Sequence, residues 1–143
     1  MEETDLTAEE LGRVRAALER VPFAHLLGIE LEAARRGAVV MRLKARAELK
    51  QSEGIIHGGA TASLIDTAAA FAVLTVVEPG ERTTTTDLTI HYLRPIISGR
   101  IRAQARVLRA GRRLVTVSIE VTDDAGALAA TGITTYLRVA SDK

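Results

Sequence analysis

The stretch from residue 51 to residue 77, QSEGIIHGGATASLIDTAAAFAVLTVV, decides the fold that this sequence predicts. From Gly58 onward it carries one ionisable side chain, that of Asp66, and it is apolar on almost every side. This pattern is typical of a helix enclosed by other elements rather than one lying on a surface. A helix from Gly58 to Val77 would be about 30 Å long, enough to cross a small domain. Glu78-Pro79-Gly80 predicts its end.

Residues 1–21 predict a short N-terminal helical extension. Thr7 and Glu10 have the form of a capping box, and Pro22 predicts the end of this helix. Its apolar residues at helical spacing are Leu11, Val14, Leu18 and Val21.

Six strands are predicted, at residues 28–34, 38–45, 83–93, 99–109, 113–122 and 128–139. The first two form a hairpin, and apolar residues alternate clearly along 101–107 and 115–121. The order of helix, hairpin, long helix and four strands suits an α+β domain in which an antiparallel sheet wraps around a long central helix. At 143 residues, the chain is predicted to be one domain, residues 1–143.

The composition excludes several functions. Cys is absent, which excludes disulfides, zinc-thiolate sites and thiol nucleophiles. Aromatic residues make up 3% of the chain and Trp is absent, which argues against a base-stacking nucleic-acid site. No dinucleotide or P-loop motif is present, and His25, His57 and His91 lack metal-ligand spacing. We therefore expect no metal, no cofactor and no nucleic-acid partner.

The sequence also predicts a cytoplasmic protein with no membrane partner. The apolar stretch is interrupted by Thr61, Ser63, Asp66, Thr67 and Thr75, which favours a buried soluble helix over a membrane span. The acidic beginning, MEETDLTAEE, lacks the basic and then apolar pattern of a secretory signal.

Arginine is concentrated in one segment of the chain. Residues 94–113 contain seven Arg and no acid, although the net charge of the whole chain is only +1. A one-sided basic face is a candidate site for an anionic ligand. The alternative is a solvated outer face of the sheet.

The first residues of the long helix are candidates for an oxyanion site. Gly58 and Gly59 follow His57 where a helix leaves backbone N–H groups unpaired and its dipole favours negative charge. Glycine lets a substrate carbonyl approach this backbone closely. The alternative is a tight turn that needs Gly only to enter the helix.

Asp66 is the candidate acid of the site, because burying a lone carboxylate is costly without a partner or a function. It lies nine residues after His57, about two and a half turns along the helix, so the two residues of one chain do not readily share a substrate. Two copies with antiparallel central helices would bring Asp66 of one near Gly58 of the other. The alternative is a structural hydrogen bond to Ser63, Thr67 or a neighbouring strand.

These residues resemble those of a known family. Gln51, His57-Gly58-Gly59, Asp66 and the strand TTDLTIHYLRP at 85–95 are similar to the hotdog-fold acyl-CoA thioesterases of the phenylacetate-degradation, or PaaI-like, type. The resemblance covers about residues 22–139. It implies a hotdog fold and the hydrolysis of an acyl-CoA to a carboxylic acid and coenzyme A. The alternative is a non-catalytic acyl-CoA binding or sensing module on the same fold.

The resemblance also implies roles for single residues. Asp66 matches the general base or nucleophile, and Gly58 matches the glycine whose N–H polarises the thioester carbonyl. His57 shapes that turn, Gln51 lies near the carbonyl or the attacking water, and Thr85 helps to orient the water. The site is built across a homodimer, with the acid from the other subunit, and pairs of dimers commonly form tetramers.

The substrate-binding residues expected from the resemblance lie in two groups. The residues expected to line the pocket are Ile55, Gly59, Ala62, Ile65 and Phe71. The candidates for binding the coenzyme A phosphates are Arg94, Arg112 and Arg113, because the Arg fork of donors suits phosphate. One departure is Ala70, where some relatives carry a hydroxyl residue one turn after the acid.

Overall fold

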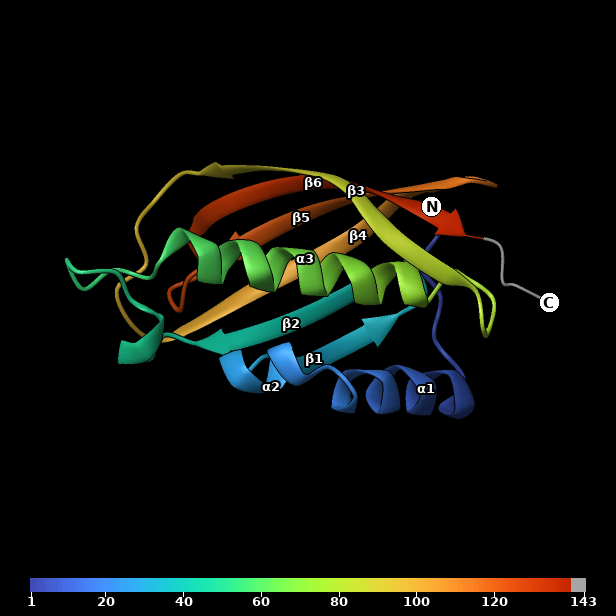
Figure 1. Cartoon of the computed structure of the whole chain (residues 1–143), viewed down its shortest axis with the longest axis horizontal. Helices are drawn as coiled ribbons and strands as arrows, with labels where there is room; N and C mark the ends of the chain where they lie inside the picture. The colour runs from blue at the N-terminus through green and yellow to red at the C-terminus, as the bar shows by residue number, and fades with distance from the viewer. Residues whose placement is uncertain (140–143) are drawn as a thin grey trace.

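The computed structural model of the protein describes residues 1–139 (Figure 1). Its helices are α1 (Ala8–Glu19), α2 (Pro22–Leu27), the 3-10 turn η1 (Ala47–Leu49) and α3 (Gly58–Leu74). Its strands are β1 (Glu30–Arg35), β2 (Ala38–Lys44), β3 (Arg82–Tyr92), β4 (Arg100–Ala110), β5 (Leu114–Thr122) and β6 (Leu128–Val139). All six predicted strands and the hairpin are therefore confirmed, with bounds that differ by a residue or two.

The six strands form one antiparallel sheet in the order β1-β2-β4-β5-β6-β3, and α3 lies lengthwise against one face of it (Figure 1). The core forms where α3 meets this inner face. Residues along β4 alternate between the two faces of the sheet. Ile101, Ala103 and Ala105 are buried, whereas Arg102 and Arg106 are exposed. This arrangement confirms the predicted α+β hotdog fold.

Small residues let the helix approach the sheet closely. Ala68, Ala69 and Ala72 of α3 are fully buried. On β6, a Cβ at Gly132 would lie 3.0 Å from the Cγ2 atom of Ile65, closer than atoms normally pack. Gly132 thus lets the strand cross directly over the helix.

Two helix ends differ from the sequence prediction. Helix α1 has the predicted capping box, in which the Glu10 N–H donates to the Thr7 hydroxyl, but it ends at Glu19. Pro22 begins the separate helix α2, because a proline at the first helical position loses no intrahelical hydrogen bond. Gly28, at a φ of 80°, ends that helix in the left-handed conformation.

The long helix α3 ends at Leu74, three residues before the predicted Val77. The Thr75 hydroxyl donates to the Ala72 carbonyl at 2.7 Å and accepts from the Gly37 N–H at 2.8 Å. The Arg13 guanidinium donates to the carbonyls of Leu74 and Val77. These partners replace the hydrogen bonds that a further helical turn would have made.

Strand β3 lies at one end of the sheet. It pairs with β6 on one side, and no strand of residues 1–139 pairs with its other edge. Eight of its 11 residues are exposed, among them the run Thr84 to Asp87. A long, open strand edge offers a row of unpaired backbone groups to another chain.

Candidate active site

Asp66 lies midway along α3, where it is half-buried and held by two hydroxyl groups from neighbouring strands. The Tyr136 hydroxyl donates to Oδ1 of Asp66 at 2.8 Å and to its backbone carbonyl at 3.0 Å. The Thr85 hydroxyl donates to the same Oδ1 at 3.2 Å. The Ser63 hydroxyl instead donates to the Gly59 carbonyl. The partners of the carboxylate therefore come from β3 and β6.

The two oxygens of the carboxylate have different surroundings. Both hydroxyl donors reach Oδ1, and no hydrogen bond reaches Oδ2 from the residues that the structure describes. Burial raises the pKa of Tyr136, and the negative charge of Asp66 raises it further against an opposing effect of Thr85. Tyr136 therefore stays protonated as a donor at working pH. Oδ2 of Asp66 is therefore the carboxylate oxygen that can accept a further hydrogen bond.

The start of α3 leaves one backbone donor unpaired. The Gly59 N–H donates to Nδ1 of His57 at 2.8 Å, so this histidine caps the helix. The N–H groups of Ala60 and Thr61 donate to the His57 carbonyl at 2.9 and 3.4 Å. Within residues 1–139, no acceptor binds the N–H of Gly58. This single group, at the positive end of the helix, can stabilise a developing negative charge.

A cavity of about 360 Å³ opens beside Gly58. Four predicted site residues line it, namely Gln51, Ile55, Gly58 and Arg94. The carbonyl oxygen of the Gln51 side chain accepts from the Glu53 N–H, which leaves its NH₂ group to donate. The cavity also includes Tyr92, whose hydroxyl donates to the Gly58 carbonyl at 2.9 Å.

Other predicted residues lie elsewhere in the chain. His57 and Gly59 line a second hollow of about 260 Å³ on the other side of the helix start. Phe71 is 6% exposed and Ile65 is fully buried, and both pack in the core against the sheet. Ala62 is half-buried on α3 and lines neither hollow. Within one chain, the structure therefore does not bring these apolar helix residues to the cavity.

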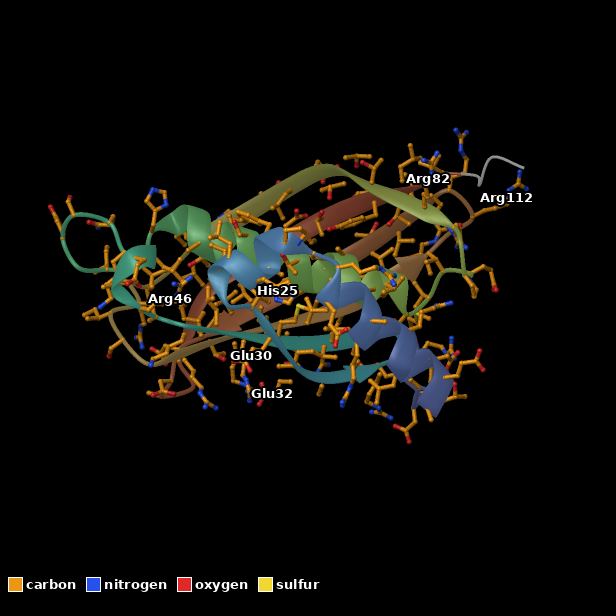
Figure 2. The ribbon with its side chains drawn as sticks, turned by 60° about the horizontal axis from the view of Figure 1, so that its bottom comes forward. His25, Glu30, Glu32, Arg46, Arg82 and Arg112 are labelled. Carbon is orange, nitrogen blue, oxygen red and sulfur yellow. The ribbon has the colours of Figure 1, made fainter. Side chains whose placement is uncertain are left out.

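The predicted arginines are divided between the two ends of the molecule. Arg94 lines the cavity, whereas Arg112 and Arg113 lie in the turn between β4 and β5. Figure 2 shows Arg112 at the same end as Arg82 and far from Arg46, which follows β2 near the start of α3. Arg94 and the Arg112–Arg113 pair of one chain therefore cannot bind the same phosphate group.

Asp66 and Gly58 are also separated within the chain. They are eight residues apart on one straight helix, about 12 Å along its axis. The candidate residues of one chain thus form two separate groups. We name Asp66 with Thr85 and Tyr136 the acid half-site, and Gly58 with Tyr92 and the cavity the oxyanion half-site.

Tyr92 and Tyr136 are not among the site residues predicted from the sequence. Both alternate onto the inner face of their strands, which the sequence pattern could have indicated. Tyr92 pairs with Ala130, and Tyr136 pairs with Thr85, so both sit where β3 and β6 lie side by side. Which turn of α3 each hydroxyl reaches depends on the register between these strands and the helix.

None of the described helices is both long enough and apolar enough to span a membrane. Among residues 1–139, no three His, Asp or Glu side chains gather in a way that could hold a metal ion.

Comparison with known proteins defines the family. The model of the thioesterase superfamily matches residues 53–130, more than half of the chain. Human acyl-coenzyme A thioesterase 13 is 33% identical over 90% of this chain and 94% of its own length. The proofreading thioesterase EntH of Klebsiella pneumoniae is 32% identical over 81% of this chain and 84% of its own.

A solved structure extends the likeness to the whole fold. The Escherichia coli PaaI protein of the phenylacetic acid degradation operon matches with a TM-score of 0.88 and 25% identity, over 96% of this chain and 98% of that one. This chain belongs to the thioesterase superfamily. The resemblance to its PaaI-like members, expected from the sequence, is confirmed.

The helix cap leads to a prediction about stability. A Cβ at Gly59 would lie 2.9 Å from Nδ1 of His57, so Gly59→Ala must displace the capping ring. We expect this change to lower the free energy of unfolding by about 1 kcal/mol, as the loss of a cap does. Gly12→Ala is the matched control, because Gly12 lies inside α1 with open space around it. It should raise stability by about 0.5–1 kcal/mol. Urea unfolding that shows equal gains for both variants would exclude a stabilising cap.

Proposed function

We propose that this protein is an acyl-CoA thioesterase whose active site forms between two subunits. The observation that carries the proposal is that, among residues 1–139, neither Oδ2 of Asp66 nor the N–H of Gly58 has a hydrogen-bond partner. The first can accept a proton or attack a carbonyl carbon, and the second can bind the carbonyl oxygen. Membership of the thioesterase superfamily supports the thioester as the bond that is cleaved.

The open edge of β3 supports the dimer. Thr85 and Tyr92 lie on the inner face near opposite ends of this strand, one beside Asp66 and the other beside Gly58. If two chains pair β3 with β3 in antiparallel fashion about a twofold axis, the Thr85 end of one strand lies beside the Tyr92 end of the other. The acid half-site of each chain then faces the oxyanion half-site of its partner. Pairing of such dimers into tetramers stays a prediction.

The reaction would proceed through the two half-sites of different chains. The thioester carbonyl oxygen accepts from the Gly58 N–H, and the NH₂ group of Gln51 can assist from the same cavity. Oδ2 of Asp66 either takes a proton from a water that attacks the carbonyl carbon, or attacks that carbon itself to form an acyl–Asp66 anhydride, which a water then hydrolyses. The carbon–sulfur bond breaks, a carbon–oxygen bond forms, and the sulfur leaves with a proton as the coenzyme A thiol. The acyl group leaves as a carboxylic acid.

The same dimer would bring Arg94 of one chain near Arg112 and Arg113 of the other. Antiparallel pairing places the start of one β3 near the end of the other, so Arg112 and Arg113 of one chain approach the end of the sheet that carries Arg94 of the other. Within residues 1–139, no acid forms an ion pair with any of these three arginines. They are candidates for binding the coenzyme A phosphates.

A free-thiol release assay over a panel of acyl-CoAs tests the proposed function. We expect release of coenzyme A from at least one short, long or aromatic acyl-CoA. If acyl-CoAs bind, as titration calorimetry would detect, but none releases thiol, the protein is a binding or sensing module instead.

A further inference from the structure

The chain has two tyrosines, and each one contacts a different half-site. Tyr136 on β6 donates to Asp66, and Tyr92 on β3 donates to Gly58. The two strands are neighbours, and both side chains face α3. No other side-chain hydroxyl of residues 1–139 except that of Thr85 bonds to either of these two helix residues.

Tyr136 fixes both the backbone and the side chain of Asp66. Its hydroxyl contacts the carbonyl oxygen of Asp66 at 3.0 Å and the carboxylate Oδ1 at 2.8 Å. The side chain is 3% exposed, so water does not compete for these contacts. Since the same hydroxyl reaches two acceptors of one residue, the carboxylate cannot rotate freely, and Oδ2 keeps one direction.

Tyr92 fixes the first residue of the helix in a different way. The hydroxyl-bearing end of its ring lies close to the backbone, since a Cβ at Gly58 would be 3.3 Å from the ring atom Cζ. Its hydroxyl donates to the Gly58 carbonyl at 2.9 Å. The side chain is nevertheless 55% exposed and lines the cavity. A large aromatic residue that is half exposed contributes less to the core than Tyr136 does, which makes a purely structural role a poor explanation for its hydroxyl contact.

We propose that the two tyrosines are positioning residues of the thioesterase reaction, one for each half-site. Tyr136 directs Oδ2 of Asp66 toward the thioester, and Tyr92 aligns the Gly58 N–H with the carbonyl oxygen. This inference rests on the proposed function. In the proposed dimer, each active site contains Tyr136 of one chain and Tyr92 of the other.

Phenylalanine at each position tests the proposal, because it keeps the ring and removes only the hydroxyl. We expect each variant to lower kcat about 10- to 100-fold, because each loses a hydrogen bond that orders a reacting group. KM should change less than about 3-fold, because neither hydroxyl binds the substrate in the ground state.

The pH dependence separates the two roles. Tyr136→Phe removes a hydrogen-bond donor from the charged carboxylate, and the loss of such a donor favours the protonated form. The acid limb of the kcat/KM profile should therefore move to higher pH. Tyr92→Phe does not change the contacts of the carboxylate. It should therefore lower kcat/KM at every pH without shifting the acid limb of the profile.

Thr134→Val is the matched structural control. Thr134 lies two residues before Tyr136 on the same face, is fully buried, and donates to the Asp87 carbonyl at 2.7 Å. Its loss should lower stability in urea as much as Tyr136→Phe does, yet leave kcat and the acid limb unchanged.

The outcomes distinguish this inference from the proposed function. A wild-type protein that releases no thiol overturns both. If the wild type is active, Asp66→Asn is inactive, and both phenylalanine variants keep the kcat and acid limb of the wild type, only the positioning roles are overturned. Equal loss of activity in Thr134→Val would also overturn them, because it would show a general effect of stability.

Discussion

Replacing Asp66 by Asn is expected to lower kcat by about 10²- to 10⁴-fold, the usual cost of removing a general base or nucleophile. Asparagine has the same shape, and its carbonyl oxygen can still accept from the hydroxyls of Tyr136 and Thr85. Its NH₂ group then stands at the position of Oδ2, where it can neither take a proton nor attack a carbonyl. The fold and its stability should therefore survive while the chemistry is lost. Thiol release and urea unfolding measure the two separately.

Asp87→Asn is the control for this prediction. Asp87 lies on β3, the strand that also carries Thr85, and it is exposed. Among residues 1–139, its carboxylate accepts only from the Thr86 hydroxyl, at 3.3 Å. We expect its kcat to stay within about 3-fold of the wild type, because surface substitutions have small effects. Wild-type activity in Asp66→Asn would remove Asp66 from the mechanism. An equal loss of kcat in both variants would show that the reaction depends on the negative charge of this region rather than on the Asp66 carboxylate itself.

The sequence predicts the acid because Asp66 is the one charge on an apolar helix, and helical spacing shows that it cannot reach Gly58. Its hydrogen-bond partners are harder to predict. Alternation along β3 from Tyr92 through Ile90 and Leu88 would continue to Thr86 on the inner face. The structure has a bulge between Thr85 and Asp87, which turns Thr85 inward instead. Family resemblance selected Thr85, whereas the strand pattern alone would have selected its neighbour.

The lining of the pocket could not be predicted for a related reason. Helix α3 is apolar on nearly all sides, so its pattern does not separate the face against the sheet from a face toward substrate. Phe71 and Ile65 are therefore predicted to line the pocket, whereas in the structure both pack in the core. The cavity is formed instead by segments that meet only in the fold: Gln51, Ile55 and the end of β3.

Gly58→Pro is expected to lower kcat by about 10²- to 10³-fold, as the loss of one oxyanion donor does. Proline removes the backbone N–H and changes little else at this position. It is favoured at the first residue of a helix, which Gly58 occupies. His57 already has a φ of −62° and a ψ of 132°, the extended conformation required before proline.

Gly58→Ala isolates the contribution of the N–H group. Both variants add a Cβ that lies 3.3 Å from the Tyr92 ring, so both require the same small shift of that ring. Only the proline variant lacks the donor. We expect the alanine variant to keep at least about ten times the kcat of the proline variant. Equal rates in the two variants would show that steric contact with Tyr92, rather than the N–H, controls the reaction.

Mixing the two inactive variants then tests whether the half-sites belong to different chains. In a heterodimer of Asp66→Asn and Gly58→Pro, one site combines both lesions, and the other combines the intact Asp66 of one chain with the intact Gly58 of its partner. Random exchange after unfolding and refolding makes about half of the dimers mixed, so about one quarter of wild-type activity should return. If each site were built within one chain, every site in the mixture would carry a lesion, and activity would stay at the level of the parents. Recovery therefore requires that Asp66 act on a carbonyl held by the helix of the neighbouring subunit.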